Sequence, residues 1–185
     1  MRVFISGGCK NGKSFFAQNL AKQMQMPGLP LYYLATMIPC DEEDRLRIEN
    51  HQHEREGWGF ETVEMSDDIS TIVNQCDVRG TFLLDSVTAL LANAMFSQTG
   101  KVNRNAPQKL ASELVALTEK ISRIVFVSDF IYSDAAIFDE LTETYRQGLA
   151  LIDRELAKVC DSVLEIMHGT VIDYKQKSSH AGERR

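Results

Sequence analysis

The sequence predicts an α/β fold in which helices cover a mainly parallel β-sheet. Short apolar runs, typical of buried strands, alternate along the chain with segments whose apolar residues recur at helical spacing. The length of 185 residues suits one sizeable core and is short for two. We therefore predict one domain over residues 1–176, followed by a disordered polar tail over residues 177–185.

A glycine-rich motif joins the first strand to the first helix. Residues 6–14 read Ser-Gly-Gly-Cys-Lys-Asn-Gly-Lys-Ser after the apolar run Val3–Ile5, and they fit the phosphate-loop pattern G-x-x-x-x-G-K-[ST]. Backbone N–H groups of such a loop surround phosphate oxygens, and the helix that follows adds its positive N-terminal end. A purely structural glycine turn would need neither the second glycine nor the Lys-Ser pair. The motif therefore predicts a single P-loop NTPase domain.

The motif also assigns roles to individual residues. Lys13 is expected to reach the terminal phosphates as a catalytic group, and Ser14 is expected to bind Mg²⁺ through its hydroxyl. The predicted nucleotide-binding residues of the loop are Gly7, Gly8, Cys9, Lys10, Asn11, Gly12, Lys13 and Ser14.

The next elements complete a β-α-β unit. A helix is predicted after the loop, up to the break at Pro27-Gly28, and its recurring apolar residues are Phe15, Phe16, Leu20 and Met24. Residues 31–35 then form an apolar strand. Because no hairpin turn separates these elements, the two strands are expected to be parallel.

A charged helix is predicted over residues 41–55. Acidic residues come early and basic residues later, which is the order that a helix dipole favours. Arg47, His51 and Arg55 are spaced four residues apart and so share one side. A histidine between two guanidinium groups suits phosphate chemistry, and a solvated charged helix is the alternative that these residues leave open.

A carboxylate ends a later strand. After a short strand over residues 60–64 and a helix around residues 69–73, residues 81–85 read Thr-Phe-Leu-Leu-Asp. Phosphate-loop enzymes hold their metal through a second acidic group of this kind, which makes Asp85 a predicted Mg²⁺ ligand. The alternative is that Asp85 only caps the helix that follows.

The second half continues the same alternation. Helices are predicted over residues 87–95, from Pro107 to 121, and over residues 138–156, with a buried strand at residues 124–128. Residues 162–166 and, past the turn at His168-Gly169, residues 171–172 close the sheet. The last strand is expected to be short and antiparallel.

Composition excludes several classes of protein. The net charge of −6 and the lack of a basic stripe argue against nucleic-acid binding. Cys9, Cys40, Cys76 and Cys160 form no C-x-x-C pair, so neither a zinc site nor a disulfide framework is indicated. No apolar run has membrane-spanning length and no leader pattern is present, so we expect a cytoplasmic protein with reduced thiols.

Together these motifs resemble one family, the bifunctional adenosylcobinamide kinase/adenosylcobinamide-phosphate guanylyltransferase of cobalamin biosynthesis. This chain has counterparts of four motifs of the family: the doubled loop glycine, the Tyr-x-Ala-Thr strand, the Arg-Ile-x-x-His helix and the Thr-x-Glu segment. The resemblance runs from Arg2 to about Tyr174. The matching residues are Gly7-Gly8, Gly12-Lys13-Ser14, Tyr33-Leu34-Ala35-Thr36, Arg47-Ile48-Glu49-Asn50-His51, Arg55 and Thr62-Val63-Glu64.

The resemblance implies two reactions. A nucleoside triphosphate, GTP or ATP, phosphorylates the corrinoid, and His51 then accepts GMP from GTP as a covalent intermediate and passes it to the phosphorylated corrinoid. It also implies Mg²⁺, a homotrimer, and further nucleotide contacts from Ala35, Thr36, Met37, Arg55, Glu64 and Asp85.

One segment departs from the family pattern. Where the family carries Asn-Glu-Val-Gly, this chain has Ser128-Asp129-Phe130-Ile131-Tyr132. This difference keeps two alternatives open: a kinase of another small molecule that does not use His51, and a nucleotide-binding regulatory protein without guanylyltransferase activity.

Overall fold

The computed structural model describes residues 1–39, 41–96, 101–133 and 135–175. Within these ranges the chain forms a seven-stranded sheet with the order β3-β2-β4-β5-β1-β6-β7. The strands are β1 (Arg2–Gly7), β2 (Leu31–Ala35), β3 (Phe60–Glu64), β4 (Thr81–Asp85), β5 (Ile124–Val127), β6 (Ser162–Met167) and β7 (Thr170–Asp173). All neighbouring pairs are parallel except β6 and β7, which are antiparallel. The predicted fold class is confirmed; Cys40 and the predicted tail lie outside the described residues.

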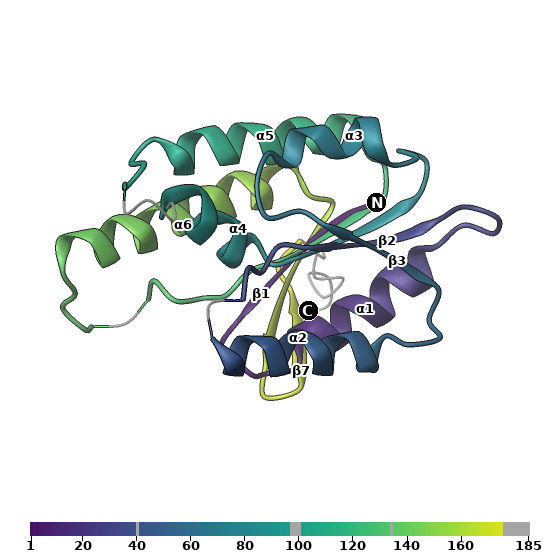
Figure 1. Cartoon of the computed structure of the whole chain (residues 1–185), viewed down its shortest axis with the longest axis horizontal. Helices are drawn as coiled ribbons and strands as arrows, with labels where there is room; N and C mark the ends of the chain where they lie inside the picture. Colours follow the sequence, from purple (N-terminus) through teal and green to yellow (C-terminus); the bar gives the residue numbers. More distant parts are fainter. Residues whose placement is uncertain (40, 97–100, 134, 176–185) are drawn as a thin grey trace, which may run out of the picture.

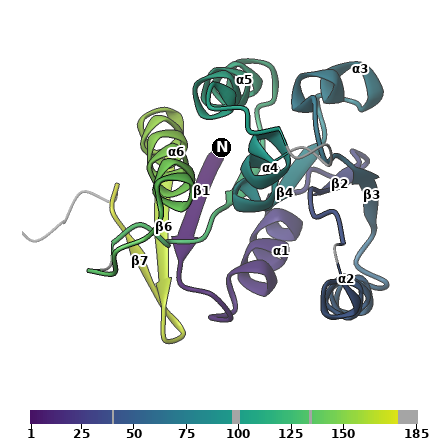
Figure 2. The same cartoon turned by 60° about the vertical axis from the view of Figure 1, so that its left-hand side comes forward.

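Helices cover both faces of this sheet (Figures 1 and 2). They are α1 (Lys13–Met24), α2 (Glu42–Glu54), α3 (Ile72–Gln75) after a 3₁₀ turn at Ile69–Thr71, α4 (Val87–Met95), α5 (Ala106–Lys120) and α6 (Glu140–Val159). Figure 2 shows α1 and α2 on one side of the strands and α4, α5 and α6 on the other. None of these helices is both long and apolar enough to cross a membrane.

Strand alternation divides the core into two layers. Val3 and Ile5 of β1 pack with Ala17 and Ala21 of α1, whereas Phe4 belongs to the larger cluster under α3 to α6. Successive side chains of a strand point to opposite faces, so one buried strand supplies both layers. This explains why the parallel strands read as unbroken apolar runs in the sequence.

Two element predictions need correction. Of the apolar residues expected to recur on α1, Phe16, Leu20 and Met24 pack against the core beside Ala17 and Ala21, whereas Phe15 is 53% exposed. The last helix begins at Glu140 and not at Phe138, because the Asp139 side chain caps it by accepting bonds from the N–H groups of Leu141 and Thr142.

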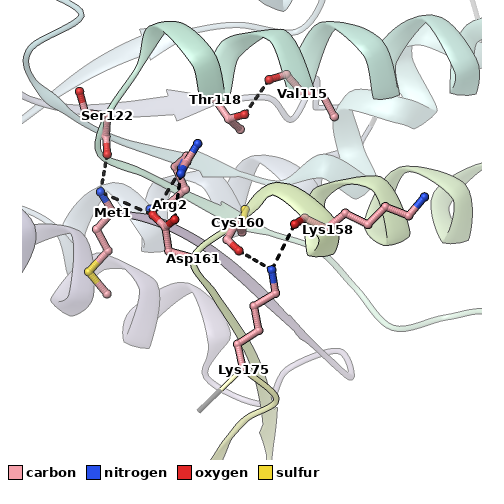
Figure 3. A network of polar contacts seen from close by, with 9 residues as sticks. All are labelled: Met1, Arg2, Val115, Thr118, Ser122, Lys158, Cys160, Asp161 and Lys175. Atoms are coloured by element: carbon pink, nitrogen blue, oxygen red, sulfur yellow. Dashed lines mark hydrogen bonds and ion pairs between the residues drawn. The ribbon is translucent and has the colours of Figure 1, made fainter. Parts of the chain in front are cut away.

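Polar contacts join the chain at the amino-terminal ends of β1 and β6, opposite the carboxyl ends of the parallel strands (Figure 3). The Arg2 backbone N–H donates to Asp161 Oδ2 at 2.7 Å, and Arg2 Nη2 donates to Asp161 Oδ1 at 2.9 Å. This bonding lowers the pKa of the Asp161 carboxyl. Lys175 Nζ donates to the carbonyl oxygens of Cys160 at 2.5 Å and Lys158 at 3.3 Å, which satisfies the C-terminal end of α6. The amino end of β1 is thereby tied to the turn that starts β6.

A buried carboxylate lies between α6 and the segment after β5. Asp153 is 3% exposed, and its Oδ2 accepts hydrogen bonds from Ser128 Oγ at 3.0 Å and Tyr132 OH at 3.1 Å. Burial raises the pKa of Asp153 to about 7; the two hydroxyl donors oppose this shift, and the nearby Asp129 charge adds to it.

This pKa predicts a stability effect. An unfolded aspartate ionises near pH 4, so between about pH 4 and pH 7 the folded state binds the extra proton and stability falls as pH rises. The free energy of unfolding of Asp153→Asn, minus that of the wild type, should therefore rise by about 2 kcal/mol from pH 5 to pH 8. Urea unfolding at the two pH values measures this difference. Asp161→Asn is the control, because a lowered pKa completes its titration below pH 5. An equal wild-type-to-variant difference for Asp153→Asn at both pH values would contradict the prediction.

Candidate nucleotide site

The phosphate loop is shaped by close contact with β6. A Cβ built on Gly7 would lie 2.4 Å from the carbonyl oxygen of Ile166, so only glycine fits there. The Asn11 side-chain amide donates to that same carbonyl oxygen. Gly12 has φ of 84° at the residue that caps α1, a left-handed conformation that favours glycine. The loop is thus bent so that α1 begins at Lys13, with the N–H groups of its first turn at the loop.

A cavity of about 310 Å³ adjoins this loop. Residues 9–15 line one side of it, and residues at the ends of β4 and β5 line the other, including Asp85 and Asp129. The loop residues Cys9 to Ser14, which the sequence predicts to bind nucleotide, therefore line one cavity. The carboxylates of Asp85 and Asp129 lie on its other side.

The loop lysine is buried and paired. Lys13 is 6% exposed, and its Nζ lies 2.9 Å from Asp129 Oδ1 and donates to the Gly8 carbonyl oxygen at 2.6 Å. Asp129 is positioned by its own N–H, which donates to Thr88 Oγ1 at 2.9 Å, and by the Phe130 N–H, which donates to the Gly7 carbonyl oxygen at 2.9 Å. Sequence reasoning did not select Asp129, although a carboxylate directly after a buried strand was a usable signal.

Asp85 lies at the end of β4, and it is not the cap of α4. Ser86 caps that helix by accepting a bond from the Ala89 N–H at 3.2 Å, which removes the alternative role considered for Asp85. The Tyr33 hydroxyl donates to Asp85 Oδ2 at 3.0 Å. Ser14, Asp85 and Asp129 line the same cavity. Hydroxyl and carboxylate oxygens suit Mg²⁺, so the donor set fits that ion.

A smaller cavity of about 70 Å³ lies between α2 and the ends of β2 and β4. Each residue predicted to contact nucleotide outside the loop lines it: Ala35, Thr36, Met37, Arg55, Glu64 and Asp85. Met37, Asp85 and Ser86 line this cavity and the phosphate-loop cavity alike. The two cavities are therefore neighbouring parts of one site.

Arg55 gives the smaller cavity its positive charge. It is 7% exposed, its guanidinium carbon lies 4.0 Å from the Tyr33 ring centroid, and Nη2 donates to Thr62 Oγ1 at 3.4 Å. The attraction between a guanidinium and the face of an aromatic ring stabilises the cation where it is partly removed from water. The same Tyr33 side chain therefore contacts Arg55 through its ring and Asp85 through its hydroxyl.

Thr36 joins the ends of β2 and β4. Its hydroxyl donates to the Ser86 carbonyl oxygen at 2.8 Å and accepts from the Ser86 N–H at 2.7 Å. Asn93 of α4 donates to the carbonyl oxygens of Thr36 at 2.7 Å and Ser66 at 3.0 Å. These contacts hold the backbone around Ser86, which lines both cavities.

His51 lies on α2, and its side chain is outside the described part of the structure. The helical period places position 51 beside Ile48 and Arg55, which both line the smaller cavity. His53 is 80% exposed and its Nδ1 lies 3.5 Å from Glu56 Oε2. Ile48 and Gln52 are the described residues of α2 that line the smaller cavity, and the catalytic role of His51 stays a prediction.

Comparison with known proteins identifies the family. A sequence model described as "Cobinamide kinase / cobinamide phosphate guanyltransferase" matches residues 3–174. The chain belongs to this family. Members of the family are transferases of cobalamin synthesis, and nucleotide and corrinoid substrates fit this membership. No curated protein matches the chain significantly.

Solved structures support the fold at low sequence identity. An ATPase domain among them has a TM-score of 0.52 and 11% identity, covering 89% of this chain and 68% of that one. The KaiC-like protein PH0186 from Pyrococcus horikoshii OT3 has a TM-score of 0.52 and 14% identity, covering 99% and 83%. A second protein of that organism, PH0250, has a TM-score of 0.54 and 12% identity, covering 94% and 85%. The family member described here thus has a P-loop NTPase fold.

The contact at Gly7 predicts that alanine substitutions at Gly7 and Gly8 differ in their effect on stability. Gly7→Ala should lower the free energy of unfolding by about 2 kcal/mol, because its methyl group would overlap the Ile166 carbonyl oxygen. Gly8→Ala is the matched control, because a Cβ there meets nothing within 4 Å. Urea unfolding of both variants measures the difference, and equal stabilities would show that the loop does not need this close approach.

Proposed function

We propose that this protein phosphorylates the hydroxyl of adenosylcobinamide and transfers GMP from GTP, through His51, to the phosphorylated product. The observation that carries the proposal is the shared wall of the two cavities, which places a lysine-containing phosphate loop next to the helix of His51. A nucleotide whose phosphates lie on the loop would have its α-phosphate within reach of that helix.

The kinase step needs positively charged groups next to the phosphoryl group that is transferred. The acceptor hydroxyl attacks the γ-phosphorus, the bond to the β–γ bridging oxygen breaks, and the nucleoside diphosphate leaves. Lys13 stabilises the charge that develops on the transferred group, and Asp129 holds the Lys13 ammonium at the loop. Positioning and charge supply most of the catalysis in such transfers.

Ser14 and Asp85 would hold Mg²⁺, with Asp129 as a further oxygen donor across the same cavity. The bound ion would neutralise charge on the phosphate oxygens of the nucleotide.

The guanylyl step uses a nitrogen nucleophile. A neutral imidazole nitrogen of His51 attacks the α-phosphorus of GTP, a P–N bond forms, and the bond to pyrophosphate breaks. A phosphate oxygen of the corrinoid phosphate then attacks the same phosphorus and releases the histidine. Arg55, one helical turn from position 51, supplies positive charge on this side of the site.

An adduct experiment tests the guanylyl step. Incubation with Mg²⁺ and GTP labelled at the α-phosphate should give a covalent adduct that is acid-labile and base-stable, because it contains a P–N bond. His51→Ala should abolish the adduct and His53→Ala should retain it, because His53 lies on the exposed side of α2. Absence of an adduct on the wild-type protein, with phosphoryl transfer intact, would favour a kinase that does not use His51.

The Lys13–Asp129 pair predicts an effect on the kinase step. Asp129→Asn should lower kcat for γ-phosphoryl transfer to adenosylcobinamide about tenfold or more, because the loop lysine loses its anionic partner. Asp67→Asn, at an exposed carboxylate after β3, controls for net charge. Unchanged kcat in Asp129→Asn would remove Asp129 from the proposal.

The trimer implied by the family resemblance remains a prediction. Light scattering of the purified full chain should give the mass of three copies of the 20.9 kDa chain.

A further inference from the structure

A third cavity lies on the other face of the sheet. Its volume is about 420 Å³, and α6, β1, β6 and the segment after β5 line it. It shares no lining residue with the two cavities of the nucleotide site. Small-molecule pockets span roughly 300–1,000 Å³, so its size is sufficient for a small ligand.

Two buried oxygen atoms at this cavity have no hydrogen-bond donor in the described part of the chain. One is Asp153 Oδ1 and the other is Ser6 Oγ, and both residues line the cavity. Asp153 Oδ2 already accepts hydrogen bonds from two hydroxyl groups, so Oδ1 is the carboxylate oxygen that lacks a donor. Buried polar atoms are nearly always bonded, and leaving a carboxylate oxygen without a donor is costly. A ligand that donates hydrogen bonds would satisfy these atoms.

The surrounding charges favour a cation. Glu165 is a second carboxylate on the cavity wall, and Tyr174 OH donates to it. The one basic side chain among the described residues that line the cavity is Arg154, which is 66% exposed and lies 3.9 Å from Glu155 Oε1. An anion would therefore meet Asp153 in a buried setting, where repulsion is weakly screened.

Aromatic side chains form part of the apolar wall of this cavity. Phe130 and Tyr132 pack edge to face with ring centroids 4.8 Å apart, and Tyr174 lines the cavity with them. Aromatic faces attract ammonium groups and also cover hydrocarbon. Carboxylate and aromatic groups together match a ligand with a charged amine and an apolar body.

We propose that this cavity is a second ligand site, for a small organic ammonium compound with an apolar or aromatic body. The ammonium donates to Asp153 Oδ1 and Ser6 Oγ, and the body packs against Phe130 and Tyr132. The segment that forms this wall also carries Asp129, which pairs with Lys13. A ligand here therefore contacts residues one position away from the nucleotide site, on the opposite face of the sheet.

Binding of three matched probes tests the proposal. The full chain is titrated at pH 8, where Asp153 is charged, with 2-phenylethylamine, 2-phenylethanol and 3-phenylpropionate, and binding is followed by ¹H–¹⁵N NMR. The amine should bind at least tenfold more tightly than either other probe, with shifts at residues of α6 and β6. Saturating GTP should not displace it. Equal binding of the three probes, or displacement by GTP, would overturn the proposal.

Two variants locate the probe. Asp153→Asn removes the carboxylate charge, and Ala150→Leu fills the cavity without changing either carboxylate. Each should weaken amine binding at least tenfold, so the test survives if one variant fails to fold. Glu140→Gln is the charge-matched control on α6, because Glu140 pairs with Arg104 and does not line the cavity. Amine binding retained by both Asp153→Asn and Ala150→Leu would place the probe elsewhere and refute the site.

Discussion

A lysine ammonium that is almost fully buried must be paired, and the pairing of Lys13 with Asp129 organises this site. Loss of hydration costs an ammonium several kcal/mol unless anionic and carbonyl partners replace the water. Here the partners are the Gly8 carbonyl oxygen and the carboxylate that follows β5. The pair forms because β5 is the strand directly beside β1, which places the end of one next to the loop of the other. It links the conformation of the phosphate loop to the segment after β5.

The site divides into two parts with different physical character. The phosphate-loop part combines helix N–H groups, a lysine and carboxylates, as a polyphosphate with a metal ion requires. The smaller part, under α2, contains a guanidinium stacked on a tyrosine. Four hydrogen bonds made by Thr36, Ser86 and Asn93 hold the backbone where the two parts meet. The contact between the two parts supports the proposed action on two different phosphates of one nucleotide.

The segment after β5 serves both faces of the sheet. Ser128 and Tyr132 donate to the buried Asp153 of α6, whereas Asp129, between them, pairs with Lys13. This is where the sequence departs from the family pattern, and the structure shows that the departure retains a carboxylate facing the loop lysine. The hydroxyl groups on either side of it bind one oxygen of this carboxylate, and its second oxygen is buried without a hydrogen-bond partner in the described part of the chain.

Local patterns were sufficient to predict most elements. The loop between β1 and α1, the apolar strands and the charged α2 depend on neighbouring residues, and the structure confirms these elements. The ends of helices were harder to predict: Asp139 determines where α6 begins by bonding to N–H groups, which apolar spacing does not reveal. The involvement of His51 came from family resemblance and remains to be tested. The sequence by itself determined most elements and the phosphate-loop motif, because both depend on residues close together along the chain. Only the tertiary structure decided that Asp129 meets Lys13, that Arg55 stacks on Tyr33 and that Asp153 is buried, because each pairing depends on strand order and helix packing between distant residues.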